Sequence, residues 1–241
     1  MRIDRYLSTA LGISRKDAAV LIKKGAVAIG GVQAKSKDAQ AEGLITVNGQ
    51  AVEYHEHVHI MLNKPAGVLT AARDKNAPTV MQFIDPALVK RGISPVGRLD
   101  KDVTGLLIFT TDGELNHRLT SPLRDVPKVY IAKVNGVLTD EDAALMSGGM
   151  NLGDFTAKPA KLEILGESSG RLTVTEGKFH QVKRMFDKVG KPVEELRRIS
   201  VAGVEIDGTE TLAEGECREL SEQEVRRLYS VAGIKQGEVA E

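Results

Sequence analysis

Tryptophan is absent from this 241-residue chain, and a single cysteine, Cys217, is present. One thiol can form neither an internal disulfide bond nor a multi-cysteine zinc site, which is typical of proteins in a reducing cytoplasm. Long apolar runs are missing too: the longest, Ala18 to Ile22, has about five residues, whereas a membrane span needs roughly 18. The first residues alternate charged and apolar side chains and form no signal-peptide apolar region. We therefore expect a cytoplasmic protein without a membrane segment.

Phosphate-binding glycine loops of the P-loop type and clusters with metal-ligand spacing are also lacking. His55, His57 and His59 alternate, so on a strand they would share one face and could imitate a metal site. Neither a cysteine nor a second ligand cluster accompanies them. We interpret them as solvated side chains of a polar linker and expect no metal site.

The formal net charge of 0 hides an uneven distribution. Residues 1–37 carry eight basic and two acidic side chains, a local charge of +6, whereas residues 205–241 carry ten acidic and four basic ones, a local charge of −6. A basic N-terminal segment is typical of proteins that bind nucleic-acid phosphates, although a solvated lysine-rich helix face is the alternative. The candidate RNA-binding residues are Arg2, Arg5, Arg15, Lys16, Lys23 and Lys24.

Length alone predicts two unequal domains. Near the N-terminus, apolar spacing predicts two helices, the second capped by Ser14 and ended at Gly25, and then two hairpins with glycine-containing turns. The polar run from Tyr54 to His59 breaks the apolar pattern. We therefore expect one domain at residues 1–57 and another at 58–241. The expected elements of the first domain are a helix over 2–11, a helix from 15 to 24, and hairpins around Gly30–Gly31 and Asn48–Gly49.

Short strand-like runs recur in the second domain, with helices between some of them. Because they lack the steady strand–helix alternation of a parallel sheet, we expect an α+β fold with a mostly antiparallel sheet. The expected strands are 60–62, 106–109, 130–134, 160–165, 171–175 and 201–206. The expected helices are 111–119, one from a Thr139 cap to Gly148, 181–189, and one that begins at Ser221 with Glu224 in a capping box.

A carboxylate on a glycine-flanked loop marks the start of the chemistry. The segment Gly97-Arg98-Leu99-Asp100 follows Pro95 and precedes a buried strand, a place where rigid scaffolding often holds functional groups. Taken alone, Asp100 could equally cap a turn and pair with Arg98. Three further motifs surround it in the chain: residues 64–67 (KPAG), 128–130 (KVY) and 176–185 (EGKFHQVKRM).

Together these motifs resemble the pseudouridine synthases, specifically the family that modifies a single uridine in small-subunit (16S) ribosomal RNA. Asp100 matches the catalytic aspartate in that family's signature. The N-terminal unit resembles an S4 RNA-binding domain, so the resemblance covers nearly the whole chain. It implies a small S4-like domain followed by a mostly antiparallel-sheet synthase domain.

The resemblance implies that uracil is detached from C1′ of its ribose, rotated, and rejoined through C5 without a metal, nucleotide or redox cofactor. Asp100 would act as a nucleophile at C1′ or C6, or as a base, and these alternatives stay open. A carboxylate beside a flipped base tends to take up a proton unless a cation is close. Lys183 matches the family's basic partner; outside the motif, Lys183 and Arg184 would be interpreted as an exposed pair on a helix.

Other site residues follow from the same resemblance. Tyr130 would pack on the target base and could remove the C5 proton, although a core tyrosine is the ordinary alternative. Leu196 would shield the pocket, which is compatible with plain core packing, and Arg98 would bind phosphate or the flipped nucleotide. The remaining candidates for substrate binding are Lys64, His180 and Gln181. We assign no chemistry to Cys217.

The expected partner is ribosomal RNA or a small-subunit assembly intermediate, and the protein is expected to be a monomer. Two other functions stay open: the same reaction on large-subunit (23S) RNA, and a non-catalytic role in RNA binding or ribosome assembly. The set of Asp100, Tyr130 and Lys183 argues against the non-catalytic role. Lysine rather than arginine at position 183 favours the small-subunit type, by analogy alone.

Overall fold

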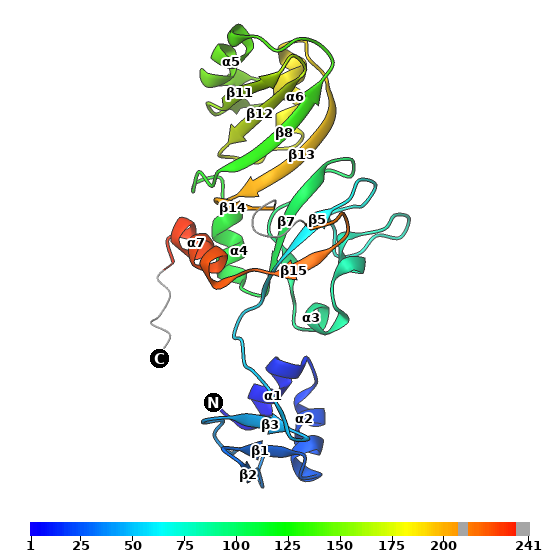
Figure 1. Cartoon of the computed structure of the whole chain (residues 1–241), viewed down its shortest axis with the longest axis vertical. Helices are drawn as coiled ribbons and strands as arrows, with labels where there is room; N and C mark the ends of the chain where they lie inside the picture. Colours follow the sequence, from blue (N-terminus) through cyan, green and yellow to red (C-terminus); the bar gives the residue numbers. More distant parts are fainter. Residues whose placement is uncertain (207–211, 235–241) are drawn as a thin grey trace. The chain divides into compact units, whose positions relative to one another are not determined.

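A computed structural model describes residues 1–206 and 212–234. The chain divides into two compact units (Figure 1). The first comprises Met1–Val58 and Ile84–Ile93, and the second comprises His59–Phe83 and the described residues from Ser94 onward. The segment Ile84–Ile93, which the sequence analysis placed in the second domain, thus groups with the N-terminal unit. No helix in the described ranges is long and apolar enough to cross a bilayer.

The N-terminal unit contains three helices and a four-stranded sheet, and it includes the two expected helices and both expected hairpins. The hydroxyl of Ser14 accepts a hydrogen bond from the Asp17 backbone N–H at 3.1 Å, which is the expected N-cap. The short helix in Ile84–Ile93 begins with Pro86 and was not expected. The elements are α1 (Ile3–Leu11), α2 (Arg15–Lys23), β1 (Val27–Ile29), β2 (Val32–Gln33), β3 (Ile45–Val47), β4 (Gln50–Ala51) and α3 (Pro86–Lys90), with sheet order β2-β1-β3-β4.

A nine-stranded sheet forms the second unit, and most of its strand pairs are antiparallel, as expected. The exception is β13, which pairs parallel to β7 through Arg197 opposite Thr104 and Arg198 opposite Gly105. The sheet runs in the order β11-β12-β8-β13-β7-β5-β15, with β14 beside β13 and β6 beside β7. The strands are β5 (His59–Lys64), β6 (Ser94–Pro95), β7 (Thr104–Thr110), β8 (Lys128–Val134), β11 (Lys161–Gly166), β12 (Ser169–Val174), β13 (Val193–Val201), β14 (Val204–Glu205) and β15 (Cys217–Glu219), and β9 (Met150–Asn151) pairs with β10 (Thr156–Ala157) separately.

Helices cover this sheet in two groups. Leucines of α4 and α7 pack with strands β5, β7 and β14 in one apolar core, whereas α5 lies against β11 and α6 against β13 (Figure 1). The expected capping box from Ser221 to Glu224 is present, and the expected Thr139 cap forms a second box with Asp142. The helices are the 3-10 helix η1 (Val80–Phe83), α4 (Gly113–Thr120), α5 (Asp140–Ser147), α6 (Gln181–Lys188) and α7 (Glu222–Ala232).

The longest strand differs from the expectation. A strand was expected over 201–206, but β13 spans Val193–Val201 and a tight turn at Ala202 and Gly203, both with positive φ, separates it from β14. The sequence of β13 contains two pairs of charged residues, Glu194-Glu195 and Arg197-Arg198, so it does not show the apolar pattern of a strand. One of those charges is buried: Arg198 is 2% exposed and donates its Nε to the Leu106 carbonyl at 2.8 Å. A buried arginine breaks the apolar alternation by which a strand is detected in the sequence.

Candidate active site

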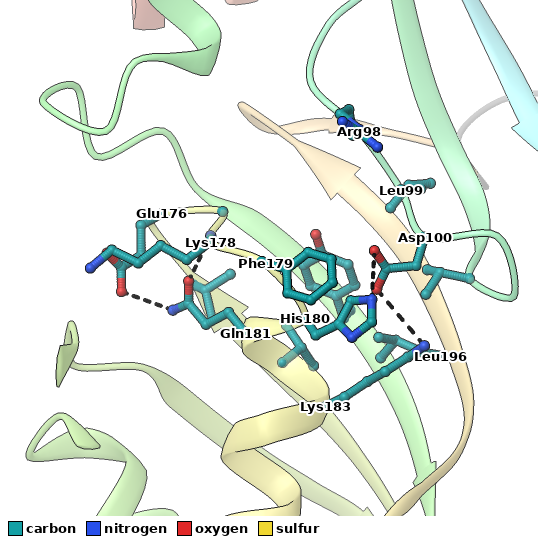
Figure 2. A pocket seen from close by; sticks show the side chains of 15 residues that line it. Arg98, Leu99, Asp100, Glu176, Lys178, Phe179, His180, Gln181, Lys183 and Leu196 are labelled. Atoms are coloured by element: carbon teal, nitrogen blue, oxygen red, sulfur yellow. Dashed lines mark hydrogen bonds and ion pairs between the residues drawn. The ribbon is translucent and has the colours of Figure 1, made fainter. Parts of the chain in front are cut away.

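Residues from three of the four sequence motifs, those at 97–100, 128–130 and 176–185, surround one cavity of about 360 Å³ in the second unit. This volume is within the range of small-molecule sites. The loop between β6 and β7, strands β8 and β13, and the connection from β12 to α6 form its wall (Figure 2). The lining residues that the argument uses are Arg98, Asp100, Tyr130, Phe179, Lys183 and Leu196.

The loop that carries Asp100 is fixed from two sides. The hydroxyl of buried Thr70 donates to the Leu99 carbonyl at 2.8 Å and accepts from the Leu99 N–H at 3.2 Å. On the other side, the ammonium of Lys64 donates to the backbone carbonyls of Pro65, Lys101 and Val103 at 2.9, 3.2 and 2.9 Å. The carboxylate of Asp100 is therefore presented by a rigid loop, which is what positioned chemistry requires.

Lys64 was expected to bind substrate, and the structure corrects this. Its side chain is fully buried, does not line the cavity, and its three N–H groups point to carbonyls. Burial lowers the pKa of Lys64 to about 8. Its place in the fold is that of a positioning residue for the Asp100 loop.

One ammonium lies between two carboxylates. Lys183 donates to both carboxylate oxygens of Asp102 at 2.7 Å, and its Nζ is 3.8 Å from Oδ2 of Asp100. The expected pair with Asp100 is thus present, but the closer partner is Asp102, which the sequence analysis did not single out. The hydrogen bond from Lys183 holds the pKa of the Asp102 carboxyl below its usual value.

A second basic group reaches the same carboxylate. Nε2 of His180 is 3.6 Å from Oδ1 of Asp100, as the dashed lines in Figure 2 show. His180 has φ +50° at the N-terminus of α6. Its imidazole stacks on the ring of Phe179, with centroids 3.8 Å apart and planes at 17°.

Gln181 lines the cavity, yet its amide is engaged within the loop. It donates to Oε1 of the buried Glu176 at 2.9 Å and accepts from the Lys178 backbone N–H at 3.1 Å. Glu176 also accepts from the Lys158 backbone N–H at 2.7 Å. These bonds fix the connection that carries Phe179 and His180, so Gln181 positions the wall of the cavity.

The other expected residues are placed as follows. Tyr130 and Leu196 are buried cavity-lining residues on β8 and β13, and Arg98 is an exposed lining residue. Burial raises the pKa of the Cys217 thiol to about 11, so it stays protonated near neutral pH. In the other unit, all six basic candidates are exposed: Arg2, Arg5, Arg15, Lys16, Lys23 and Lys24.

The arrangement offers a carboxylate on a rigid loop, two basic groups beside it, a tyrosine and an apolar wall. A carboxylate of this kind can act as a nucleophile or as a base. Within residues 1–206 and 212–234, no group of three or more His, Cys, Asp or Glu side chains could hold a metal ion. Sequence reasoning missed Thr70, Asp102 and Phe179. Asp102 and Phe179 lie in or next to quoted motifs, which was the available signal, whereas Thr70 had none.

Comparison with known proteins finds similar sequences and a similar fold. Residues 58–188 match the family described as RNA pseudouridylate synthase. The chain is 41% identical over 236 residues to an uncharacterized RNA pseudouridine synthase of Bacillus subtilis, covering 95% of this chain and 98% of the relative. It is 36% identical over 231 residues to ribosomal small subunit pseudouridine synthase A of Escherichia coli K12, covering 93% and 98%. A crystal structure of a pseudouridylate synthase, 36% identical, superposes with a TM-score of 0.67 over 95% of this chain and 99% of that one.

Proposed function

This chain belongs to the RNA pseudouridylate synthase family, and from that premise we propose that it converts one uridine of small-subunit (16S) ribosomal RNA to pseudouridine. The observation that carries the proposal is the Asp100 carboxylate in the cavity, with Lys183 and His180 beside it. The small-subunit RNA is favoured because relatives that share almost the whole chain carry the name ribosomal small subunit pseudouridine synthase A.

The reaction breaks the bond from C1′ to N1, turns the uracil and forms the bond from C1′ to C5. The C5 proton is released to water, and N1 takes up a proton from water, so the product is an isomer of the substrate. No electrons are gained or lost. Asp100 would act as a nucleophile at C1′ or C6, or as the base that starts a glycal route. Leu196 and Tyr130 would contact the base from the buried side of the cavity, and the Tyr130 hydroxyl is a candidate acceptor for the C5 proton. Arg98, exposed in the wall, would hold a phosphate of the flipped nucleotide.

The experiment uses each purified ribosomal RNA, labelled with tritium at uridine C5, and measures tritium release and the position of pseudouridine. We expect one modified uridine, in 16S RNA. Asp100→Asn should release no tritium while its RNA affinity stays within a few fold, because phosphate contacts supply most of the binding. Turnover by Asp100→Asn would contradict the catalytic assignment. Modification confined to 23S RNA would contradict the substrate. No release from either RNA, nor from small-subunit assembly intermediates assayed in the same way, would contradict the enzyme itself.

For the N-terminal unit we propose an S4-like RNA-binding role. Its support is four exposed basic side chains at the two ends of α2: Arg15, Lys16, Lys23 and Lys24. Arg2 contributes less, because its guanidinium pairs with Asp4 and Asp38 at 2.9 and 2.7 Å. The protein would then hold RNA by one unit and modify it in the other.

Salt dependence tests this role. The test variant carries Gln in place of these four Arg and Lys residues. The slope of log affinity against log salt concentration should become shallower by about 0.7 to 0.9 for each phosphate that the variant no longer binds. Lys133→Gln, in an exposed pair with Glu195 on the second unit, is the control and should leave the slope unchanged. An unchanged slope in the α2 variant would mean that this face does not bind RNA.

A further inference from the structure

The most exposed aromatic ring lies in the wall of the cavity. All nine Phe and Tyr residues lie in the described part of the chain, and among them only Phe179 is largely exposed, at 75%. Exposing a phenyl ring to water is unfavourable. Because Phe179 borders the Asp100 cavity, its exposure suggests a face kept open for a ligand.

The ring is also held in a fixed orientation. His180 stacks on one face of Phe179 at 3.8 Å, and the His180 imidazole itself lies 3.6 Å from Asp100. Figure 2 shows the two rings side by side next to the Asp100 carboxylate. The connection beneath them is fastened by the bonds of Gln181 to Glu176 and to the Lys178 N–H. A ring that is already ordered loses little conformational entropy when a ligand stacks on it.

A second phenylalanine nearby makes the contrast clear. Phe155 lies under two cations, with Lys178 Nζ at 4.3 Å and Arg184 Cζ at 4.9 Å from its centroid. Those cations occupy that ring. Phe179 has an aromatic neighbour on one face and large exposure overall, so its other face suits a flat, uncharged π-system such as a nucleobase.

We propose that Phe179 stacks on the base next to the flipped uridine and thereby positions the RNA strand at the cavity mouth. This rests on the proposed function. The flipped uracil itself needs the buried part of the cavity, where Tyr130 and Leu196 are 8% and 7% exposed. A ring that is 75% exposed meets the part of the strand that stays outside. The exposed Arg98 in the same wall suits a phosphate of that strand.

Kinetics provide the first test, with full-length protein and C5-tritiated RNA under single-turnover conditions. Phe179→Ala should raise the RNA concentration for half-maximal rate about five- to 100-fold, the usual effect of removing one base stack. The rate at saturating RNA should stay within a few fold. Phe179→Trp should restore affinity, because any large ring offers a face. Leu123→Ala, which removes a 90% exposed apolar side chain that does not line the cavity, is the matched control and should change neither quantity.

Fluorescence provides the second test. An RNA fragment with the mapped uridine carries 2-aminopurine immediately 5′ or 3′ of it, and stacking quenches this base. Binding to the inactive Asp100→Asn protein should quench one of the two positions, and adding Phe179→Ala should abolish that quenching. Unchanged half-saturation in Phe179→Ala, a loss confined to the saturating rate, or quenching that persists without Phe179 would each overturn the inference while the wild-type activity still stands. A wild-type protein that modifies no uridine would overturn the proposed function, and the inference with it.

Discussion

Lys183 is the residue whose replacement should separate activity from stability most clearly. Among the described residues, Lys183 supplies the only ammonium within 4 Å of Asp100. Lys183→Met removes that charge, so Asp100 and Asp102 both lose their ion pair with it. Opposite charges 4 Å apart near a protein surface attract by about 4 kcal/mol. Since the Asp100 and Lys183 side chains are 31% and 21% exposed, solvent should reduce this to about 2 kcal/mol, or about 30-fold in rate.

The same change should cost little stability. The closer partner, Asp102, has a side chain that is 72% exposed, and ion pairs with such exposed groups contribute up to about 1 kcal/mol. We therefore expect tritium release from Lys183→Met to fall about 30-fold or more, while the free energy of unfolding in urea changes by about 1 kcal/mol or less. Lys183→Arg should keep part of the rate, because the charge survives and its geometry changes.

The matched control is Lys133→Met, which removes another lysine–carboxylate pair, with Glu195 at 3.1 Å, on neighbouring strands of the same sheet. It does not line the cavity and should leave the rate unchanged. Near-normal turnover by Lys183→Met would refute the reasoning from charge. A large loss of stability in that variant would also refute it, because the lower rate would then reflect unfolding.

Two further changes test the support of the site. Gly105→Ala should destabilise the protein by about 3 kcal/mol or more. Residue 105 has φ +99°, and the added Cβ would lie 2.2 Å from the Arg198 carbonyl oxygen. The control in urea titrations is Gly153→Ala, at φ +100° with open space around it, which should lower the free energy of unfolding clearly less. Lys64→Met should destabilise by about 2 to 3 kcal/mol and lower kcat more than RNA affinity, because the carbonyls of Pro65, Lys101 and Val103 lose their donor and the Asp100 loop loosens. Equal stability of the two proteins would contradict the positioning role.

Local signals in the sequence predicted the elements that they control. Ser14, Thr139 and Ser221 each precede a helix and accept hydrogen bonds from its first N–H groups, and such caps act over three residues. The glycine-containing turns predicted both N-terminal hairpins for the same reason. Most of strand β13 was not predicted. Its buried Arg198 is accommodated by a hydrogen bond to Leu106, 92 positions away, and a local sequence pattern cannot show such a contact.

The site follows the same division. Asp100, Tyr130, Lys183 and Leu196 were expected from motifs, and the structure gathers them around one cavity. The sequence predicted Asp100 as the partner of Lys183 and missed Asp102, which lies closer to the ammonium. Spacing along the chain does not show which of the two carboxylates is nearer. Thr70, which clamps Leu99 from 29 positions away, left no trace in the sequence, since a single hydroxyl in a loop has no distinctive pattern.

The parallel pairing of β13 with β7 bears on how the chain folds. It joins residues that are more than 90 positions apart, whereas β11 and β12 pair within a hairpin. Closing so long a loop costs entropy before any contact compensates it, so pairings of this kind form slowly. Asp100 lies just before β7, and Lys183 and Leu196 come from the chain that ends in β13. A growing polypeptide therefore has no complete site until its synthesis has passed β13, and the catalytic constellation should be among the last features to appear during refolding.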